Sequence, residues 1–462
     1  MLRKARRVHF VGIGGAGMSG IAELLLNLGF QVSGSDIAES EGVRRLRDLG
    51  ARVALGHREE QVRGADVVVY SSAIGPDNVE VAAARCGKVP VIRRAEMLAE
   101  LMRVKYAVAV AGTHGKTTTT SLVASVLSEG GLDPTVVVGG RVNSLGANAR
   151  LGRGEFLVAE ADESDGSFLR LCPSVAVVTT VDAEHLDFYG ELDALKRAFL
   201  EFVNKVPFYG FSVLCLDEPH VESLLPRLEK KFFTYGLREE ADYSASGIAH
   251  AGGGVSFTVH RRGEELGRIR LRVPGAHNAR NALAALAVGM ELEVDFERAR
   301  RGLEAFSGIE RRFQRVGEAA GVLVVDDYGH HPAEIRATLR AAREAHPGRR
   351  LVVAFQPHRY TRTHLLGEEF HTSFFEADQL FITPIYPAGE RPIEGVDARQ
   401  ILEGVVERGH PDARFVDSLG DLPDALAEAA RRGDLVLTLG AGDVWKAGRA
   451  LLVRLESKVL QR

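Results

Sequence analysis

The chain has 462 residues, of which 45% are hydrophobic and 26% are charged, a composition typical of globular proteins. Its length suggests about three domains of roughly 150 residues each. The formal net charge of −4 gives no reason to expect nucleic acid or an anionic membrane as a partner.

The three cysteines lie far apart and form no Cys-x-x-Cys pair. Their spacing disfavours a disulfide framework and a thiolate zinc site, and it is typical of the reducing cytoplasm. The N-terminal segment is basic and then apolar, but its apolar run breaks at glycines, so it predicts a strand and not a signal peptide. No apolar run reaches the length of about 18 residues that a membrane span needs. We expect a cytoplasmic protein, either a monomer or a weak homodimer.

The first predicted elements alternate between strand and helix. Residues 7–13, 30–36 and 65–73 predict strands, and residues 18–29 predict an amphipathic helix that ends at a glycine. Such alternation indicates a parallel sheet with right-handed crossovers. We place this Rossmann-like first domain at residues 1–104.

A second strand series begins at the next apolar run and predicts a central domain at residues 105–307. Its predicted strands are residues 105–112, 134–140, 155–163 and 174–182. After about residue 240 the pattern changes, because residues 249–275 alternate with turn residues and predict antiparallel strands. A helix is predicted at residues 278–292.

The third series fills residues 308–462 and predicts another Rossmann-like domain. Its predicted strands are residues 321–329, 349–358, 378–387 and 434–442, and a helix is predicted at residues 332–345. The predicted fold class is therefore α/β in three domains, with a parallel sheet and a small antiparallel portion in the central one.

A glycine loop follows the first predicted strand. Gly12, Gly14 and Gly17 form Gly-x-Gly-x-x-Gly before a helix, and Asp36 ends the next strand, where a ribose-binding acid would lie. Glycines let the backbone approach a diphosphate, whose charge the helix N-terminus favours. By itself the motif indicates a dinucleotide-binding dehydrogenase, and the alternative is a turn needed only for close packing.

A second glycine loop joins strand to helix in the central domain. Gly112, Gly115, Lys116 and Thr117 resemble a phosphate loop, although the usual spacing places the first glycine two residues earlier, where this chain has valine. Such a loop cradles a triphosphate, with the lysine on its outer oxygens and the threonine hydroxyl on Mg²⁺. The alternative is a helix start at which a threonine only caps.

Carboxylates follow the next central strands, as a magnesium-dependent phosphate loop requires. The first group comprises Glu160, Asp162, Glu163 and Asp165. His185 follows another strand, and because a histidine is unusual for Mg²⁺, a buried structural histidine remains an open alternative. Asn278 and Asn281 begin a helix, where their amides suit a purine edge or only a helix cap.

Polar clusters follow the strands of the third domain. They are Asp326, Asp327, Tyr328, His330 and His331; then His358, Arg359 and Arg362; then Tyr386 and Glu390. Ligands bind beyond the carboxyl ends of parallel strands, so the clusters indicate one crevice, although a solvated face explains any single one. The arginines suit a carboxylate or a phosphate.

Together these motifs resemble the Mur ligases, the ATP-dependent amide-bond ligases of peptidoglycan synthesis. The segments that carry the resemblance are FVGIGGAGMSGIA, AGTHGKTTTT, AEADESDGSFL, HNARNALAA, DDYGHHP and QPHRYTRT. The resemblance covers the whole chain in three domains, and the last two segments place it with the alanine-adding branch. The short Gly-Thr-x-Gly-Lys-Thr loop is this family's form of the phosphate loop.

The resemblance implies a role for each motif. It assigns the UDP-sugar to Gly12, Gly14, Gly15, Ala16, Gly17, Asp36, His57, Ser71, Ser72, Ala73, Asn148, Arg311 and Arg312. It assigns ATP to Gly112, Thr113, Gly115, Lys116, Thr117, Thr118, Asn278 and Asn281, and the metal, Mg²⁺ or Mn²⁺, to Thr117, Glu160 and His185. It assigns the amino acid to Tyr328, His330, His358, Arg359 and Arg362, and catalysis to Lys116, Glu160, His185, His330, His358, Arg359 and Arg362.

The implied substrates are UDP-N-acetylmuramate, L-alanine and ATP, and the implied reaction passes through an acyl phosphate. Several family members carry a carbamylated lysine about 15 residues after the matching histidine, but Phe199 and Leu200 stand near that place here. We therefore predict no carbamate. Two alternatives remain besides a dehydrogenase: a sister ligase that adds another amino acid or peptide, and a sensor that binds both nucleotides without turnover.

Overall fold

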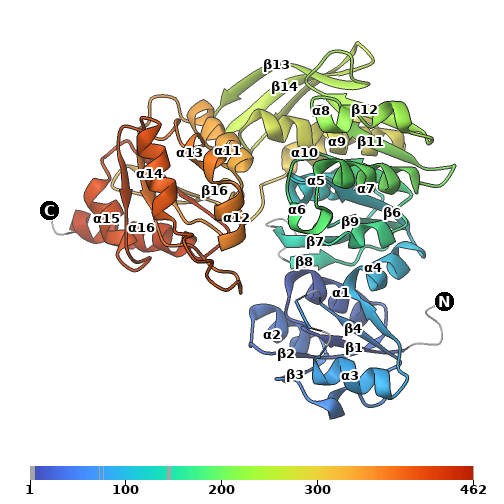
Figure 1. The fold of residues 1–462 in the computed structure, drawn as a ribbon. Coiled ribbons are helices and arrows are strands. Elements are labelled where there is room, and N and C mark those ends of the chain that lie inside the picture. Colours follow the sequence, from blue (N-terminus) through green and yellow to red (C-terminus); the bar gives the residue numbers. More distant parts are fainter. Residues whose placement is uncertain (1–5, 72, 76, 143–146, 461–462) are drawn as a thin grey trace. The chain divides into compact units, whose positions relative to one another are not determined.

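The computed structural model describes residues 6–71, 73–75, 77–142 and 147–460. In this part of the chain the strands form three sheets with helices packed against them (Figure 1). The chain divides into two compact units. The first comprises the residues up to Gly247 with Phe257–Ile269 and Arg280–Phe306; the second comprises Ile248–Ser256, Arg270–Ala279 and the chain from Ser307.

The first sheet is parallel and has the strand order β3-β2-β1-β4-β5. Its strands are β1 (Arg7–Val11), β2 (Gln31–Asp36), β3 (Arg52–Leu55), β4 (Val67–Tyr70) and β5 (Val91–Arg93). Its helices are α1 (Ala16–Asn27), α2 (Glu41–Asp48), α3 (Val79–Cys86), α4 (Arg94–Met102) and the short η1 (Glu59–Val62). The strand order reverses between β1 and β4, which is where open α/β sheets bind ligands.

The central sheet has the order β15-β14-β13-β12-β11-β10-β6-β9-β7-β8. Its strands are β6 (Tyr106–Ala111), β7 (Thr135–Val142), β8 (Ala147–Arg150), β9 (Phe156–Glu160), β10 (Val175–Val178), β11 (Phe211–Cys215), β12 (Phe232–Gly236), β13 (Tyr243–Ala251), β14 (Gly254–Arg261) and β15 (Glu264–Leu271). The helices are α5 (Lys116–Glu129), η2 (Ser167–Arg170), α6 (Leu186–Tyr189), α7 (Leu192–Asn204), α8 (Pro219–Glu222), η3 (Leu225–Arg227), α9 (Ala276–Glu291) and α10 (Phe296–Ala305).

The pairing in the central sheet follows from its sequence. β6 and β10 are apolar and buried, and such strands are typical of a parallel sheet covered on both faces. Two-residue connections join β13 to β14 and β14 to β15, as the predicted antiparallel strands require. The sequence did not predict β8, which pairs antiparallel with β7, because this edge strand is short and lacks an apolar run.

The third sheet has the order β16-β17-β21-β18-β19-β20 and is parallel except for β16. Its strands are β16 (Gln314–Ala319), β17 (Val322–Asp327), β18 (Leu351–Phe355), β19 (Gln379–Ile382), β20 (Ala413–Phe415) and β21 (Leu435–Leu439). Its helices are α11 (Pro332–Ala345), α12 (Tyr360–Leu365), α13 (Gly367–His371), α14 (Arg399–Glu407), α15 (Leu422–Ala429) and α16 (Trp445–Leu460). The polar strand β16 was not predicted.

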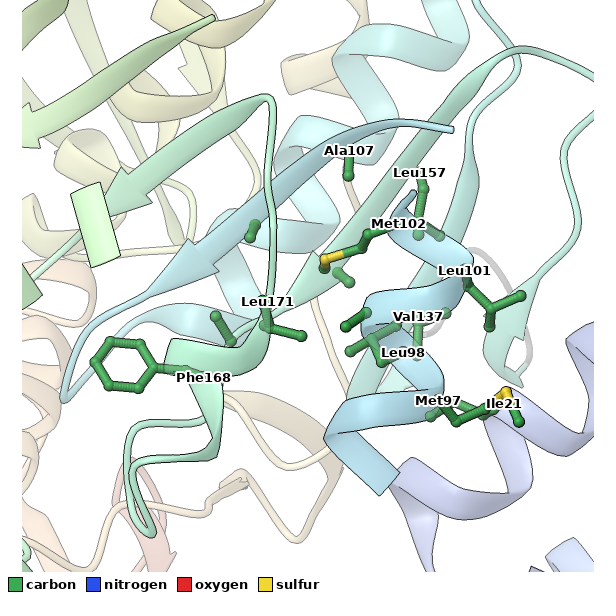
Figure 2. Close-up of a cluster of buried hydrophobic side chains, with 14 of the residues drawn as sticks. Ile21, Met97, Leu98, Leu101, Met102, Ala107, Val137, Leu157, Phe168 and Leu171 are labelled. Atoms are coloured by element: carbon green, nitrogen blue, oxygen red, sulfur yellow. The ribbon is translucent and has the colours of Figure 1, made fainter. Parts of the chain in front are cut away.

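One hydrophobic core spans the first and central sheets within the first unit. Met97, Leu98 and Leu101 on α4 are buried together with Ile21 of α1 and Leu157 of β9 (Figure 2). Helix α4 therefore fixes the first sheet against the central one. No helix in the described part of the chain combines the length and the apolar character needed to cross a membrane.

The shared core predicts the effect of a cavity. Leu101→Ala removes a side chain that is 2% exposed, and we expect it to lower the free energy of unfolding by about 2–5 kcal/mol. Val104→Ala is the matched control, because Val104 is 60% exposed just beyond the same helix. Urea unfolding followed by circular dichroism measures both. Equal effects of the two substitutions would contradict the shared core.

Candidate active site

The phosphate loop runs from β6 to α5 through residues 112–115. Both of its glycines have left-handed backbone angles, with φ of 135° at Gly112 and 78° at Gly115. A Cβ atom at Gly112 would lie 2.0 Å from the hydroxyl oxygen of Thr179, and one at Gly115 would lie 2.8 Å from the side-chain oxygen of Asn281. Since neither position has room for a side chain, the short loop depends on both glycines.

The loop is tied to the segment that follows β10. The Thr113 amide donates to the carbonyl oxygen of Thr180 at 3.0 Å, and the His114 amide donates to the Thr180 hydroxyl at 2.8 Å. The Thr113 hydroxyl accepts the Asp182 amide at 2.9 Å, while α5 begins after Gly115 without a side-chain cap. Thr113 therefore joins two loops instead of capping the helix.

Lys116 is held among oxygen atoms at the start of α5. Its Nζ lies 2.9 Å from both carboxylate oxygens of Glu163, and it donates to two carbonyl oxygens of the loop at 2.6 and 3.2 Å. Burial lowers the pKa of Lys116, but the negative charges of Glu163 and Asp162 raise it by more, so the net pKa lies above its ordinary value. The ammonium therefore stays charged at neutral pH.

The predicted acids gather at the carboxyl end of β9. Glu160 is the last residue of that strand, and Asp162 accepts the Ser164 amide at 3.1 Å. Burial raises the pKa of Asp162, but Lys116 and the bonds from Ser164 lower it by more, so it lies below its ordinary value. Glu163 was predicted only as one of the acids that could hold Mg²⁺, and its contact with the lysine was not predicted.

His185 lies beside the same acids. It has a φ of 57° and precedes α6, and its Nε2 is 3.7 Å from Oε1 of Glu163. The Tyr189 hydroxyl donates to the carbonyl oxygen of Glu163 at 2.6 Å and fixes this turn. The structure therefore brings His185 to the acid cluster, where its metal-binding role stays a prediction.

The donor atoms around the loop fit a magnesium ion. Among the described residues, no group of three or more His, Cys, Asp or Glu side chains is arranged to hold a metal. Mg²⁺ needs few protein ligands, however, because it keeps waters and binds substrate phosphates. The Thr117 hydroxyl and the Glu160 carboxylate supply the hard oxygen atoms that it prefers, and the His185 nitrogen suits it less well.

The two predicted adenine-binding amides lie near the start of α9. Asn281 is 8% exposed, and its Oδ1 accepts the Thr119 hydroxyl at 3.2 Å, which places it against the phosphate loop. Asn278 donates to the carbonyl oxygen of Pro274 at 2.7 Å. Thr118 lies in the first turn of α5. Contact with an adenine ring stays a prediction for both amides.

The first glycine loop is fastened to the end of β2. The Gly12 amide donates to the carbonyl oxygen of Ser35 at 2.9 Å, and the Gly14 amide donates to Oδ2 of Asp36 at 2.8 Å. Gly12 has a φ of 78°, which favours glycine there. Asp36 therefore shapes the loop itself, and its predicted contact with the nucleoside is untested.

The remaining predicted residues of this site are only partly described. Gly15 precedes α1 and Ala16 begins it, while the Ser71 side chain accepts the Ala73 amide at 3.4 Å. Ser72 lies outside the described residues. Asn148 lies in β8, and its side chain is likewise outside the description.

A buried carboxylate that the sequence analysis missed supports this loop. Glu80 of α3 is 0% exposed and accepts bonds from the Ser35 hydroxyl at 2.8 Å and the Arg58 amide at 3.2 Å. His9 Nε2 lies 2.9 Å and His57 Nδ1 lies 3.3 Å from its oxygens. Burial raises the pKa of Glu80, but His9 and Ser35 lower it by more. In the sequence, the only sign of this cluster around Glu80 was the pair His9 and His57, which lie far apart in the chain.

The polar clusters of the second unit meet at the carboxyl edge of the third sheet. The ring centroids of His330 and His358 lie 5.4 Å apart, and His358 stacks on Tyr386 at 5.6 Å. Tyr328 packs edge-on against His330 at 5.5 Å. Arg362 donates to the carbonyl oxygen of His358 at 3.2 Å. This arrangement is consistent with the prediction that the polar clusters lie around one crevice.

The arginines of this unit are held in different ways. Arg311 donates to Asp326 at 3.1 Å and to the carbonyl oxygen of Gly440 at 2.5 Å, so its guanidinium fastens two strand ends. The Arg312 guanidinium lies 5.2 Å from the centre of the Tyr328 ring. Arg359 has a φ of 74°. Arg311 and Arg312 as UDP-sugar ligands stay predictions.

Two side chains of this unit have pKa values that differ from their ordinary values. Burial, with the positive surroundings of His330 and three arginines, lowers the pKa of His358 to about 3. Burial also raises the pKa of Asp327 to about 6, against the pull of Arg312 and two amide donors. His358 is therefore a neutral imidazole at physiological pH.

These features define a phosphate-loop α/β enzyme with a second, glycine-rich nucleotide loop. Three sequence models match in order along the chain: "Mur ligase family, catalytic domain" at residues 7–106, "Mur ligase middle domain" at 110–289 and "Mur ligase, glutamate ligase domain" at 311–442. The chain belongs to the Mur ligase family.

Several relatives that are 55–60% identical over nearly the whole chain share one name. The UDP-N-acetylmuramate–L-alanine ligase of Sorangium cellulosum is 60% identical over 98% of this chain and 97% of its own. The enzyme of the same name from Geobacter sulfurreducens is 56% identical over 99% of both chains. The crystal structure of the Thermotoga maritima UDP-N-acetylmuramate–alanine ligase matches with a TM-score of 0.83 and 30% identity, over 98% of this chain and 99% of its own.

The lysine contacts predict a loss of turnover. Lys116→Ala removes the charge nearest the loop, and we expect ATP-dependent product formation to fall by about 100-fold or more, because an electrostatic contact made in the transition state is lost. Lys196→Ala is the control, because Lys196 pairs only loosely with Asp193, at 3.7 Å on α7. ADP release measures both. A normal rate for the Lys116 variant would count against the ATP site.

The depressed pKa of His358 predicts a pH-dependent stability. A group whose folded pKa is near 3, below its unfolded value of about 6.5, adds stability above pH 6.5 that is lost as the pH falls toward 3. We expect His358→Gln to reduce the drop in melting temperature between pH 7 and pH 4.5. His364→Gln, at an exposed histidine of α12, is the control. An unchanged drop in the His358 variant would refute this assignment.

Proposed function

We propose that this chain is an ATP-dependent ligase that joins L-alanine to the lactyl carboxylate of UDP-N-acetylmuramate. The products are UDP-N-acetylmuramoyl-L-alanine, ADP and phosphate. The observation that carries the proposal is the 56–60% identity, over nearly the whole chain, with ligases named for this reaction. The buried contact between Lys116 and Glu163 at a phosphate loop supports it.

Each domain takes one substrate in this proposal. Residues 1–104 bind the UDP-sugar through the first glycine loop, residues 105–307 bind ATP through the phosphate loop, and residues 308–462 bind the amino acid. The glycines whose φ and packing exclude side chains support the first two assignments. The cluster of histidines, arginines and tyrosines at the edge of the third sheet supports the third.

The chemistry begins with activation of a carboxylate. A carboxylate is a poor acyl donor, because its oxide is a bad leaving group. Transfer of the γ-phosphoryl group of ATP to the lactyl carboxylate gives an acyl phosphate and ADP. The amine of L-alanine then attacks the acyl carbon, and phosphate leaves from a tetrahedral intermediate. The first step brings two anions together, and the second develops negative charge in the tetrahedral intermediate, so positive charge must be placed beside both.

Lys116 supplies that charge in the central domain. Its ammonium is partly buried, and it is oriented by two loop carbonyls and by Glu163. A triphosphate that replaced this carboxylate would meet a charged donor at the end of its loop. A bound Mg²⁺ or Mn²⁺, held by Thr117 and Glu160 with His185 beside them, would neutralise phosphate charge as a Lewis acid.

The third domain prepares the amine. Arg359 and Arg362 are suited to the carboxylate of alanine, because a guanidinium fork matches two oxygens. The amine must lose a proton before it attacks, which requires a base. With a pKa near 3, His358 is a weak proton acceptor at neutral pH, so His330, which packs against it, is the better candidate.

Each alternative function makes a prediction that an experiment can distinguish from the proposed one. A dehydrogenase gives no role to Lys116 and its acids, and NADH fluorescence would detect it. A nucleotide sensor predicts binding of UDP-sugar and ATP without ADP release. A sister ligase would turn over with another amino acid or peptide. We further propose a cytoplasmic enzyme that is a monomer or a weak homodimer, which size-exclusion chromatography with light scattering would test.

The central test is substrate-dependent ADP release. With UDP-N-acetylmuramate, ATP and Mg²⁺, we expect steady release only when L-alanine is added, because the acyl phosphate needs an amine to turn over. Phosphate release compared across L-Ala, Gly, L-Ser and D-Glu assigns the amino acid. The highest kcat/KM with D-Glu, or release without any amino acid, would overturn the proposal.

A further inference from the structure

Arg94 lies against the first glycine loop, although no motif marked it. It is the first residue of α4, and its guanidinium occupies the space beside Gly17. A Cβ atom at Gly17 would lie 2.3 Å from Nη1 and 3.2 Å from Cζ of Arg94. With glycine at this position, the guanidinium of Arg94 can lie directly against the backbone of the first glycine loop. Close packing of helix on strand is the usual reason for that glycine.

Helix α4 holds Arg94 at this place. Three residues that follow Arg94 at helical spacing, Met97, Leu98 and Leu101, are buried in the core shared by the first and central sheets (Figure 2). Its first turn is closed by Glu96, which accepts the Arg93 amide at 2.8 Å and also pairs with Arg170 of the central domain. The start of α4 is therefore fixed relative to both glycine loops, which belong to one compact unit.

The other end of the guanidinium reaches the acids of the phosphate loop. Nη2 of Arg94 lies 3.4 Å from Oδ2 of Asp162, and the arginine side chain remains 30% exposed. Asp162 directly precedes Glu163, whose carboxylate contacts Lys116. Arg94 therefore joins the first glycine loop to the acidic segment that holds the lysine of the phosphate loop.

We propose that Arg94 binds the diphosphate of the sugar nucleotide and positions it toward the phosphate loop. The inference rests on the proposed function. A guanidinium fork matches two phosphate oxygens, and its present contact with Asp162 is long enough to be exchanged for an anion. The glycine loop offers backbone amides to that anion, and Arg94 adds a positively charged side chain beside the same loop. Its link to Asp162 places the same residue next to the ATP-binding acids.

The test measures nucleotide binding without ATP or alanine. Isothermal titration of the full chain gives the Kd of UDP and of UMP, and kinetics give KM and kcat for UDP-N-acetylmuramate. We expect Arg94→Gln to weaken UDP binding by at least about tenfold, because hydrogen bonds to a charged group are lost. UMP, which lacks the second phosphate, should lose less. KM should rise more than kcat falls, and Arg94→Lys should recover part of the affinity.

Two further variants separate binding from structural support. Arg93→Gln is the matched control, because Arg93 is adjacent but donates to the Tyr70 hydroxyl at 3.3 Å, and it should leave the Kd of UDP unchanged. Asp162→Asn breaks the contact with Arg94 while keeping the guanidinium, so UDP binding should be retained or become tighter. If Arg94→Gln and Asp162→Asn lower the melting temperature equally and neither weakens UDP binding, Arg94 is only a tie between loops and the inference fails.

Other outcomes also decide the matter. If Arg94→Gln weakens UDP-N-acetylmuramate but not UDP, the arginine binds the muramoyl carboxylate, and the diphosphate assignment is wrong. If the unaltered chain binds no UDP, both the inference and the proposed role of residues 1–104 fall. Normal alanine-dependent ADP release with an unchanged UDP affinity in Arg94→Gln overturns the inference alone.

Discussion

Lys116 and several carboxylates meet at the carboxyl ends of β6 and β9, where Glu163 is buried and Lys116 is partly exposed, and the rest of the site depends on the balance of their charges. A buried charge without a partner is strongly unfavourable. Glu163 supplies the partner for Lys116, and the carbonyl oxygens of the loop accept further hydrogen bonds from the ammonium group. Because these contacts hold the lysine in place, its charged ammonium has a fixed orientation at the start of α5.

The same constraint extends toward the first sheet. Asp162 directly precedes Glu163 and contacts Arg94, and Arg94 in turn fills the space that Gly17 leaves open. The core shared by α4, α1 and the central strands prevents the two glycine loops from moving independently. Within the first unit, the fold therefore fixes the two glycine loops relative to one another.

In the second unit, the main electrostatic feature is a histidine that lies among arginines. Arg311, Arg359 and Arg362 surround His358 with positive charge, and burial adds to their effect, so its imidazole remains neutral. The carboxyl edge of the third sheet therefore combines cationic guanidinium groups with the neutral imidazole of His358. Two carboxylates lie next to these cations. Asp326 accepts a hydrogen bond from Arg311, and Asp327 accepts the amides of Phe313 and Gly329.

The sequence by itself determined that the chain forms three α/β sheets and two glycine loops. Buried parallel strands require continuous apolar runs, and loops with positive φ require glycine at fixed spacing, so both leave local patterns. Only the tertiary structure decided which acid holds Lys116, since Glu163 is 47 residues away, and that Arg94 meets Asp162, 68 residues on. Glu80 joins His9 across 71 residues. Such contacts depend on how strands and helices pack, and a charged residue carries no local sign of the partner that packing will give it.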